Sequence, residues 1–407
     1  MATPNTNTDY SGESNDVSNQ DNITAAQQNQ QRETSARVLE GAGHVDASGS
    51  PTKHYDKTID GFDFGYPRLR SAGETYFVSA NSDDPQDDFI RAAQSNRTTD
   101  ENDIKRRKII VDPGAALGNL NGVVPSFTTI EGGTFDYIAN TESEFDISGI
   151  GQDTCTVTNL GGSPETFTIA LPGSPTRDFD TQAHGIGDFA VVDDGGTLVW
   201  LVLTARTDST TYTAESPGAA TVTTGSYTVM VLKRNITFIG STFHNCVWVG
   251  NTYGTTFIDC VFEFDTVNRL GSVVGDAHLD VDDGRVWAMR MENNRFLTTD
   301  TAFTNHPKTS VPQSCFVYIE FAYDSAFQYN FFHSIGVEAS AEYQFPMQTD
   351  LHTGATYPGK GGIALGNTIR GDGWDTTGSG RLDNYLNTLL GSYPATALHN
   401  TMNGTRF

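Results

Sequence analysis

Four aspartates and a histidine crowd into one short stretch, GDAHLDVDDGRVW, at residues 275–287. On an extended strand Asp280 and Asp282 share one face, because side chains alternate with a period of two. Enzymes that cleave sugars use two carboxylates roughly 5–9 Å apart, one protonated and one ionised. The candidate catalytic residues for such a reaction are therefore Asp280, Asp282 and Asp283.

The same stretch could instead hold Ca²⁺ or Mg²⁺, since both ions take carboxylate and carbonyl oxygens as ligands. The candidate ligands are Asp276, Asp280, Asp282 and Asp283, although the twelve-residue calcium loop pattern is not met. A third alternative is a plain solvated loop. A chain with this many aspartates produces such clusters by chance, so its composition favours the third alternative, and no other cofactor is expected.

Other catalytic signatures do not occur in the sequence. GxSxG, Walker, HExxH and dinucleotide-binding patterns do not occur. The four cysteines are scattered without a CxxC pair, so neither a zinc site nor a disulfide framework is expected. RGDGWD, at residues 370–375, is interpreted as a turn, because Gly-Asp-Gly is foremost turn chemistry.

Aromatic side chains dominate residues 317–333, VYIEFAYDSAFQYNFFH. If this stretch is extended throughout, one side carries more aromatic surface than a small core needs. We expect that side to pack in the core, to contact another subunit or to bind a ligand. It comprises Phe321, Tyr323, Phe327, Tyr329 and Phe331. A turn near Asp324–Ser325 would break the alternation on which this prediction depends.

One phrase occurs twice, fourteen positions apart: STFHNCVW at 241–248 and TTFIDCVF at 255–262. Successive layers of a β-solenoid offer equivalent positions the same environment, so the repeat predicts that like side chains stack. The predicted stacked core pairs Phe243 with Phe257 and Cys246 with Cys260. The alternative is two similar strands of an ordinary β-sandwich.

This layered pattern resembles the right-handed parallel β-helices of viral tail spikes and pectate-lyase-like proteins. The resemblance covers roughly residues 236–367, where short strands recur with Asn, Gly or Asp between them. It implies a β-helix-like body, although a period of fourteen is short for a full coil of roughly twenty residues or more.

The remaining segments differ in composition. Residues 126–233 alternate strand-type runs with turn residues, which predicts an antiparallel β domain with a hairpin turn at Asp193–Gly196. Residues 1–54 are too polar to bury a core of their own, so we expect an extended arm that orders against neighbours. The predicted fold class is all-β, and its segments are a polar arm (1–54), a mixed connecting segment with a short helix (55–125), an antiparallel β domain (126–233), a β-helix-like body (234–367), and a C-terminal loop with a short helix (368–407).

Acidity is the strongest global feature: the 407 residues carry 50 Asp and Glu against 25 Lys and Arg. Of these, 35 are Asp and only 7 are Lys, a balance that resembles proteins of extreme halophiles, whose hydrated carboxylates face screening salt. An ordinary acidic surface is the alternative. A nucleic-acid partner is disfavoured, because phosphate contacts need clustered Lys and Arg. No membrane span and no secretory signal are expected from the apolar pattern.

Two functions follow as hypotheses. The first is a non-enzymatic virion structural protein of a tailed virus of a halophilic archaeon: a homotrimeric spike, turret or tail fibre. Its arm, residues 1–54, would bind other virion proteins, and its body would contact host surface glycan or S-layer. The second is a polysaccharide depolymerase that uses Asp280, Asp282 and Asp283 on the same scaffold.

Overall fold

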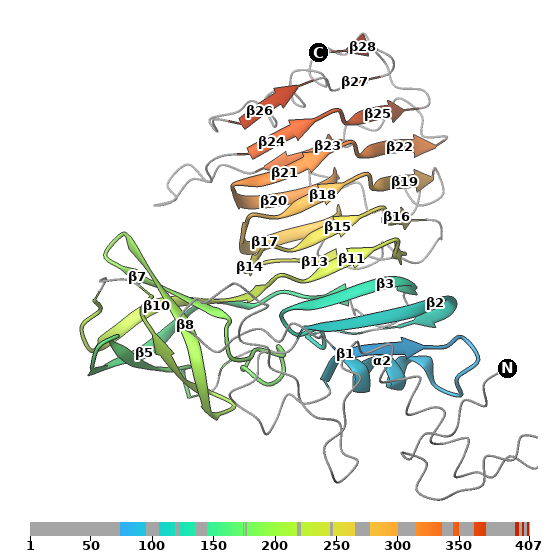
Figure 1. Ribbon diagram of the computed structural model, residues 1–407. Helices are drawn as coiled ribbons and strands as arrows, with labels where there is room; N and C mark the ends of the chain where they lie inside the picture. The colour runs from blue at the N-terminus through green and yellow to red at the C-terminus, as the bar shows by residue number, and fades with distance from the viewer. Residues whose placement is uncertain are drawn as a thin grey trace, which may run out of the picture.

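The computed structural model (Figure 1) is built almost entirely of β-strands. It describes residues 74–94, 106–118, 120, 122–135, 145–173, 175, 177–217, 221–244, 247–264, 277–299, 315–335, 345–349, 362–371, 395–398, 401–402 and 405–406. Parallel strands curl into successive layers, which we call the stack, and a closed antiparallel barrel lies on one side of it (Figure 1). Within these described residues, no helix is both long enough and apolar enough to cross a membrane.

Three lines of hydrogen-bonded strands make up the stack, and nearly all their pairings are parallel. The first line contains β1 (Glu74–Val78), β2 (Arg107–Leu117), β3 (Thr128–Phe135), β11 (Thr237–Ile239), β15 (Thr256–Ile258), β18 (Arg290–Glu292), β21 (Ser325–Gln328), β24 (Gly362–Leu365) and β26 (Ala395–Leu398). The second runs from β3 through β12 (Thr242–Phe243), β16 (Val261–Phe264), β19 (Arg295–Thr299), β22 (Phe331–Ile335), β25 (Thr368–Gly371), β27 (Thr401–Met402) and β28 (Thr405–Arg406). The third contains β4 (Phe145–Asp146), β13 (Val247–Trp248), β14 (Thr252–Tyr253), β17 (Ala277–Trp287), β20 (Cys315–Tyr323) and β23 (Phe345–Thr349).

The pairing register explains why part of the sequence repeats. Phe238 pairs with Phe257, and Phe243 pairs with Phe262, so the first complete repeat is 19 residues long. The repeated phrase is thus TFIGSTF against TFIDCVF, at 237–243 and 256–262. The predicted register, which matched Phe243 to Phe257, is wrong by five residues.

Aromatic rings fill the interior of the stack at one position per layer. Phe135, Phe243, Phe262, Phe296 and Phe332 follow one another at centroid separations of 5.1, 4.9, 4.5 and 4.8 Å, each pair stacked. All five are at most 3% exposed. Fully burying such a side chain contributes ~1.5–3 kcal/mol, and an aromatic pair adds ~0.5–1.5 kcal/mol. The interior column is therefore a principal source of the stack's stability.

A sharp corner separates the first line of strands from the second in five described layers, from β11–β12 to β24–β25. The corner residue has a positive φ in five successive layers: 62° at Gly240, 54° at Asp259, 56° at Asn293, 56° at Tyr329 and 65° at Gly366. Gly, Asn and Asp tolerate this left-handed conformation better than other residues. The recurrence of Gly, Asn and Asp in this part of the sequence therefore marks the corners.

Buried asparagines follow the corner in the upper layers. The backbone N–H of Asn294 donates to Asn330 Oδ1 (3.0 Å), and that of Asn330 donates to Asn367 Oδ1 (2.9 Å). Below them, the N–H of Cys260 donates to Asn294 Oδ1 (2.9 Å). These bonds satisfy backbone groups that the turn removes from the strand ladder, where an unpaired buried group costs ~1–3 kcal/mol.

Helix α2 (Pro85–Gln94) covers the N-terminal end of the stack interior (Figure 1). Asp84 Oδ1 accepts the N–H of Asp87 at 2.9 Å, which caps the helix start, and the acidic first turn suits the helix dipole. Phe89 is fully buried and meets Phe135 edge-on at 5.9 Å. The helix expected in this stretch is confirmed, and it closes a core that would otherwise face water.

The barrel consists of β5 (Ile150–Gly161), β6 (Thr166–Ala170), β7 (Phe189–Asp194), β8 (Thr197–Asp208), β9 (Thr211–Glu215) and β10 (Gly225–Arg234). Antiparallel pairing runs around the ring and closes between β10 and β7. The predicted hairpin turn is confirmed: Gly195 and Gly196 have φ of 60° and 98° and join β7 to β8. The barrel has its own apolar core, which includes Phe167 and Leu201.

The described strands divide the chain differently from the predicted segments. The all-β class and the antiparallel domain are confirmed, but antiparallel strands occupy 150–234 rather than 126–233. Strand β3 belongs to the stack and pairs with β11, more than a hundred residues later. The barrel is thus inserted within the stack sequence. Residues 1–54 and the short helix predicted in 368–407 lie outside the described residues.

Candidate functional site

The acidic stretch gives no assembled site in the described part of the chain. Asp276 lies outside the described residues, whereas the backbone of Asp280, Asp282 and Asp283 belongs to β17. The β17–β20 register shifts between Val281 and Arg285, the stretch that contains Asp282 and Asp283. Among the described residues, no three His, Cys, Asp or Glu side chains are grouped to hold a metal. Both the catalytic and the metal assignments stay predictions.

The five aromatic residues expected on one face do not share a face. Phe327 is 6% exposed and packs inside the stack, whereas Tyr329 is 55% exposed at a corner. Tyr323 lies outside the stack against Trp287. Positive φ values at Asp324 (50°) and Tyr329 (56°) turn the chain twice, which breaks the period-two alternation. The side chain of Phe321 is outside the description, and Phe331 is half-buried.

The predicted stacked core is only partly described. Phe243, Phe257 and Cys260 are buried in one core, whereas Cys246 lies outside the described residues. Phe257 pairs in register with Phe238, and their rings stack at 5.2 Å. Phe243 and Phe257 meet edge-on at 5.9 Å instead. Burial raises the pKa of the Cys260 thiol to about 12, so this thiol stays protonated and inert.

The region where the barrel meets the stack brings together the largest set of unusual side chains. Strand β10 belongs to both bodies: its first part pairs with β5 and β7 in the barrel. Its last two residues, Lys233 and Arg234, pair with Thr252 and Tyr253 of β14 in the stack. Because one strand is shared, the barrel is held at a fixed position beside the lower layers (Figure 1).

An aromatic seam lines this contact; we use the name for Phe189, Trp200, Tyr253, Trp287 and Tyr323. Phe189 and Trp200 project from the outer face of the barrel, and the other three project from successive layers of the stack. Trp200 meets Trp287 edge-on at 5.3 Å, and Trp287 stacks on Tyr323 at 5.0 Å. Trp287 is 7% exposed, so the barrel and the stack together remove its indole from water.

A polar cluster accompanies the seam; we call Ser126, His184, Asp188 and Arg234 the junction cluster. Asp188 is fully buried, and its Oδ2 accepts from His184 Nδ1 (2.7 Å) and from the N–H of Gly185 (3.1 Å). Its Oδ1 accepts from Ser126 Oγ. Ser126 precedes β3 of the stack, whereas His184 and Asp188 lie in the loop before β7 of the barrel. The carboxylate therefore joins the two bodies.

Arg234 completes the junction cluster at the end of β10. Its Nη1 donates to the carbonyl of Gly187 at 2.6 Å, and its backbone N–H donates to Ser126 Oγ at 2.8 Å. The guanidinium lies 3.9 Å from the centroid of Phe189 and 5.2 Å from that of Phe127. Burial lowers the pKa of Arg234, and the charge of Asp188 opposes that effect.

A serine, a histidine and an aspartate in contact suggest nucleophilic catalysis, but their order here is unsuitable. In a catalytic triad the histidine stands between the other two and takes the serine proton. Here Ser126 and His184 both bind Asp188, so the carboxylate stands in the middle. The arrangement orients two segments of chain and does not place the imidazole to activate the hydroxyl.

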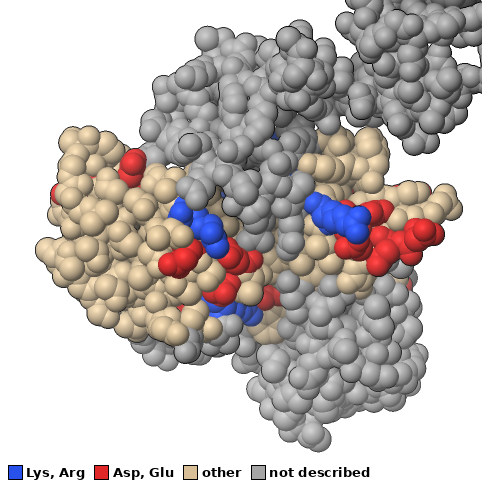
Figure 2. Space-filling view, turned by 90° about the horizontal axis from the view of Figure 1, so that it is seen from below, with Lys and Arg blue, Asp and Glu red and all other residues tan. Residues whose placement is uncertain are grey.

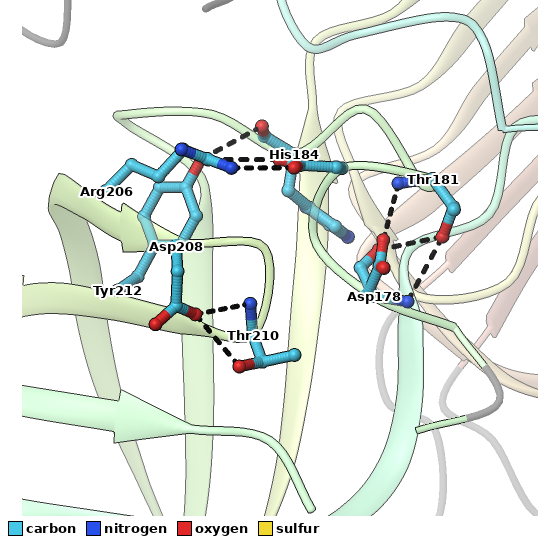
Figure 3. A network of polar contacts seen from close by, with 8 residues as sticks. Asp178, Thr181, His184, Arg206, Asp208, Thr210 and Tyr212 are labelled. Atoms are coloured by element: carbon cyan, nitrogen blue, oxygen red, sulfur yellow. Dashed lines mark hydrogen bonds and ion pairs between the residues drawn. The ribbon is translucent and has the colours of Figure 1, made fainter. Parts of the chain in front are cut away.

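A second polar network orders the loop that carries His184 (Figure 3). Arg206 on β8 binds both carboxylate oxygens of Asp180, with Nε at 3.0 Å and Nη2 at 2.7 Å. This hydrogen bonding raises the pKa of Arg206. The Tyr212 hydroxyl donates to the carbonyl of His184 at 3.3 Å. Asp178 accepts the N–H of Thr181 at 2.7 Å, which closes a turn in the same loop.

Hydrogen bonds also lower the pKa of Asp208 at the β8–β9 turn. The largest contribution comes from the backbone N–H of Thr210, at 2.8 Å, and the Thr210 hydroxyl adds a second bond at 2.9 Å (Figure 3). Asp208 therefore acts as a turn-forming carboxylate. Its interactions give no sign of a proton donor kept neutral for catalysis.

No family model matches the chain, and no curated protein matches it. Among solved structures, the chain is similar to the tailspike protein gp49 from Pseudomonas phage LKA1. The two sequences are 10% identical, and the match covers 90% of this chain and 78% of that chain. The TM-score is 0.13, which is too low to establish a shared fold.

Sequence reasoning missed the junction. The usable signal was the segment HGIGD at 184–188, in which two glycines separate a histidine from an aspartate. The tryptophans of TLVWLVL and RVWAM gave a second signal, since Trp200 and Trp287 sit in otherwise apolar strands. Neither signal reveals that the two tryptophans meet. Their contact arises only because the barrel is inserted within the stack sequence and packs against the stack.

Proposed function

We propose that the stack is a right-handed parallel β-helix and that the chain is a non-enzymatic structural subunit of a virus particle. It would project as a spike, turret or tail fibre and carry the barrel on its side. The observation that carries the proposal is the interior column from Phe135 to Phe332, whose rings follow one another at 4.5–5.1 Å through five layers. A body packed this way resists bending, as a projecting element requires.

Right-handedness is proposed from the connections between parallel strands. Crossovers between parallel strands of one sheet are right-handed in nearly all proteins, because strand twist favours that path. The stack contains many such crossovers, for example from β15 to β18 and from β18 to β21. Coils of 34 residues (Phe257 to Met291) and 36 residues (Met291 to Phe327) also agree with the length of a full β-helix coil.

The proposed partners follow from the rest of the chain. Residues 1–54 would bind other virion proteins, and the stack would associate as a homotrimer that covers exposed strand edges. Host surface glycan or S-layer is the proposed external contact. Nucleic acid is not a proposed partner, because basic and acidic side chains lie next to one another on the face seen in Figure 2. Ion pairs such as Arg206–Asp180 and Arg177–Asp146 occupy basic side chains that phosphate contacts would need.

We propose that the protein functions in concentrated salt, in a virus of a halophilic archaeon. The net charge of −25 supports this proposal. Concentrated salt shortens the Debye length to ~3 Å at 1 M, which removes the self-repulsion of so acidic a chain. We expect the assembly to persist in molar KCl and to weaken in dilute buffer.

The experiment compares the full chain with a chain that begins at residue 55, by native mass measurement in molar KCl. The proposal predicts trimers for both, and antibody against the barrel should label projections on particles from cells that make the protein. Monomers in both samples, or unlabelled particles, would contradict it. Cleavage of host-envelope polysaccharide by the wild type, lost in Asp282→Asn, would instead establish the alternative, a polysaccharide depolymerase.

A further inference from the structure

The corner between the first and second lines of strands carries one residue that its backbone conformation disfavours. Four of the five left-handed corner residues are Gly, Asp or Asn, but the fourth in order is Tyr329, with a φ of 56°. A bulky residue rarely adopts this conformation, and such outliers cluster at functional sites. The Tyr329 side chain is 55% exposed, so burial in the core does not account for it. An aromatic ring is thus kept on the surface despite a strained backbone.

The layer above holds the Tyr329 ring in one position. A Cβ atom on Gly366 would lie 2.6 Å from Tyr329 Cδ1 and 2.7 Å from its Cε1, so the ring lies directly over this glycine. The backbone N–H of Tyr329 donates to the carbonyl of Leu365 at 2.8 Å. Because the ring and its backbone are both fixed, the exposed part of the ring faces solvent in a defined orientation, which lowers the entropy cost of binding.

Two outward-facing side chains accompany this ring on the second line of strands. Arg295 of β19 and Phe331 of β22 are register partners in adjacent layers, and Phe331 follows Tyr329 by two residues. Both point outward, because Phe296 and Phe332, the residues after them, are buried in the interior column. We call Arg295, Tyr329 and Phe331 the corner patch.

Arg295 is exposed and forms no ion pair with any side chain that the structure describes. Asp259 and Glu263 lie one layer below, and neither of them is paired with it. By contrast, Arg290 in the same layer is paired with Glu292. An unpaired guanidinium on a chain with a net charge of −25 is suited to an anion supplied from outside.

We propose that the corner patch binds an acidic sugar of the host surface glycan, an inference that rests on the host contact in the proposed function. Arg295 binds the carboxylate or sulfate of the sugar, because a guanidinium presents parallel N–H donors to two oxygens of such a group. Tyr329 and Phe331 contact the apolar C–H face of the sugar ring. A neutral sugar would leave the cation unused, and an apolar protein surface would bury it without a partner.

An acidic peptide is the other anionic partner, but the surroundings of the patch favour a sugar. Peptides bind by adding a strand to a free sheet edge or by filling a groove. Strand β22 has no free edge, because it is paired with β19 on one side and with β25 on the other. In the view of Figure 1, β19 and β22 lie on the side of the stack away from the barrel, so the described barrel strands leave this face open.

The test is binding of the full chain to three immobilised sugars in molar KCl, which screens non-specific attraction. The sugars are oligogalacturonate, which carries carboxylates, dextran sulfate, and neutral dextran. The proposal predicts binding to at least one acidic sugar and about tenfold weaker binding to neutral dextran. Binding to oligogalacturonate alone assigns a carboxylate, and binding to dextran sulfate alone assigns a sulfate.

Three variants separate the patch from general charge. Arg295→Ala should weaken binding to the acidic sugar about tenfold. Tyr329→Asn should weaken it about fivefold, and it should leave the corner intact because Asn293 occupies the same position one layer below. Arg290→Ala removes the same charge from the same layer and should bind as the wild type does. Far-UV circular dichroism should be the same for all four proteins.

Several results would overturn the proposal. They are a wild type that binds neither acidic sugar or binds neutral dextran equally well, and an Arg290→Ala variant that loses as much as Arg295→Ala. Competition by polyglutamate as strong as by the acidic sugar would assign an acidic peptide instead. If Tyr329→Asn dissociates the multimer in native mass measurement without sugar, the patch is a subunit contact. If Arg295→Ala does not fold, Arg295→Lys decides, because it keeps the charge without the paired donors and must still weaken binding.

The same measurements separate this proposal from the proposed function. Labelled projections on particles, together with a protein that binds no acidic sugar, would overturn the sugar site alone. Binding of an acidic sugar by a protein that is absent from particles would overturn the virion role alone.

Discussion

Replacing Phe262 tests the interior column at its centre. Phe262 is fully buried and stacks on Phe243 at 4.9 Å and on Phe296 at 4.5 Å. Two aromatic pairs at ~0.5–1.5 kcal/mol each predict that Phe262→Leu, which keeps most of the apolar volume, costs about 1–3 kcal/mol. Phe262→Ala also leaves a cavity, so it should cost about 3–5 kcal/mol.

The assay is guanidinium unfolding followed by far-UV circular dichroism at one fixed salt concentration. Phe77→Ala is the matched control, because this ring lies on β1 and is 56% exposed. It should change the free energy of unfolding by about 0.5 kcal/mol or less. The reasoning fails if Phe262→Ala costs no more than Phe77→Ala, or if the leucine variant is as stable as the wild type.

Two further predictions concern other buried groups. Asn330→Ala should lower the free energy of unfolding by about 2–4 kcal/mol in the same assay, because the Asn294 N–H and the Met291 carbonyl lose their hydrogen bonds to Asn330. Gln328→Ala, on the outside of the stack, is the control. An equal cost for the two variants would contradict the stabilising role of the buried asparagines. Burial raises the pKa of Cys260 from 9.0 to about 12, so the folded state favours the neutral thiol. In the unfolded chain the Cys260 thiol ionises at lower pH than in the folded protein. The free energy of unfolding should therefore fall as the pH rises from 9.0 toward 12 in the wild type, and this part of the fall should be absent in Cys260→Ala. An identical pH slope in the two proteins would refute the raised pKa of Cys260.

The layered character of the stack could be predicted from a single repeat, but the register predicted from that repeat was wrong. Aligning the two copies of the phrase with Cys246 on Cys260 places Phe257 above Phe243. In the structure, the equivalent positions of successive layers are instead set by the corner residues with positive φ. Gly240 and Asp259 occupy equivalent corners. Aligning the residues that tolerate a positive φ would have given the 19-residue repeat.

The barrel insertion limits prediction in another way. Phe135 and Phe243 stack at 5.1 Å although the whole barrel lies between them in the sequence. Local patterns report which segments are strands, but they do not report that Ile130 pairs with Phe238. The aromatic face failed for a local reason, because Asp324 and Tyr329 turn the chain where alternation assumed an extended strand.

The candidate site was the least predictable part of the molecule. His184 and Asp188 are close in sequence, yet Ser126 and Arg234 come from segments that approach them only after the insertion folds back. The acidic stretch belongs to a chain in which aspartates are numerous throughout. Numerous carboxylates on an acidic chain are weaker indicators of a site than one carboxylate that is fully buried.

Disulfide trapping of register neighbours tests the layered architecture most directly. Thr237 and Thr256 are paired in adjacent layers, and neighbouring strands lie ~4.8 Å apart, within reach of a disulfide. Thr237→Cys with Thr256→Cys should form an intrachain disulfide in the folded protein, detected by peptide mass. Thr242→Cys with Thr256→Cys, separated by the fourteen residues of the sequence phrase, should not. The reverse outcome would contradict the stack.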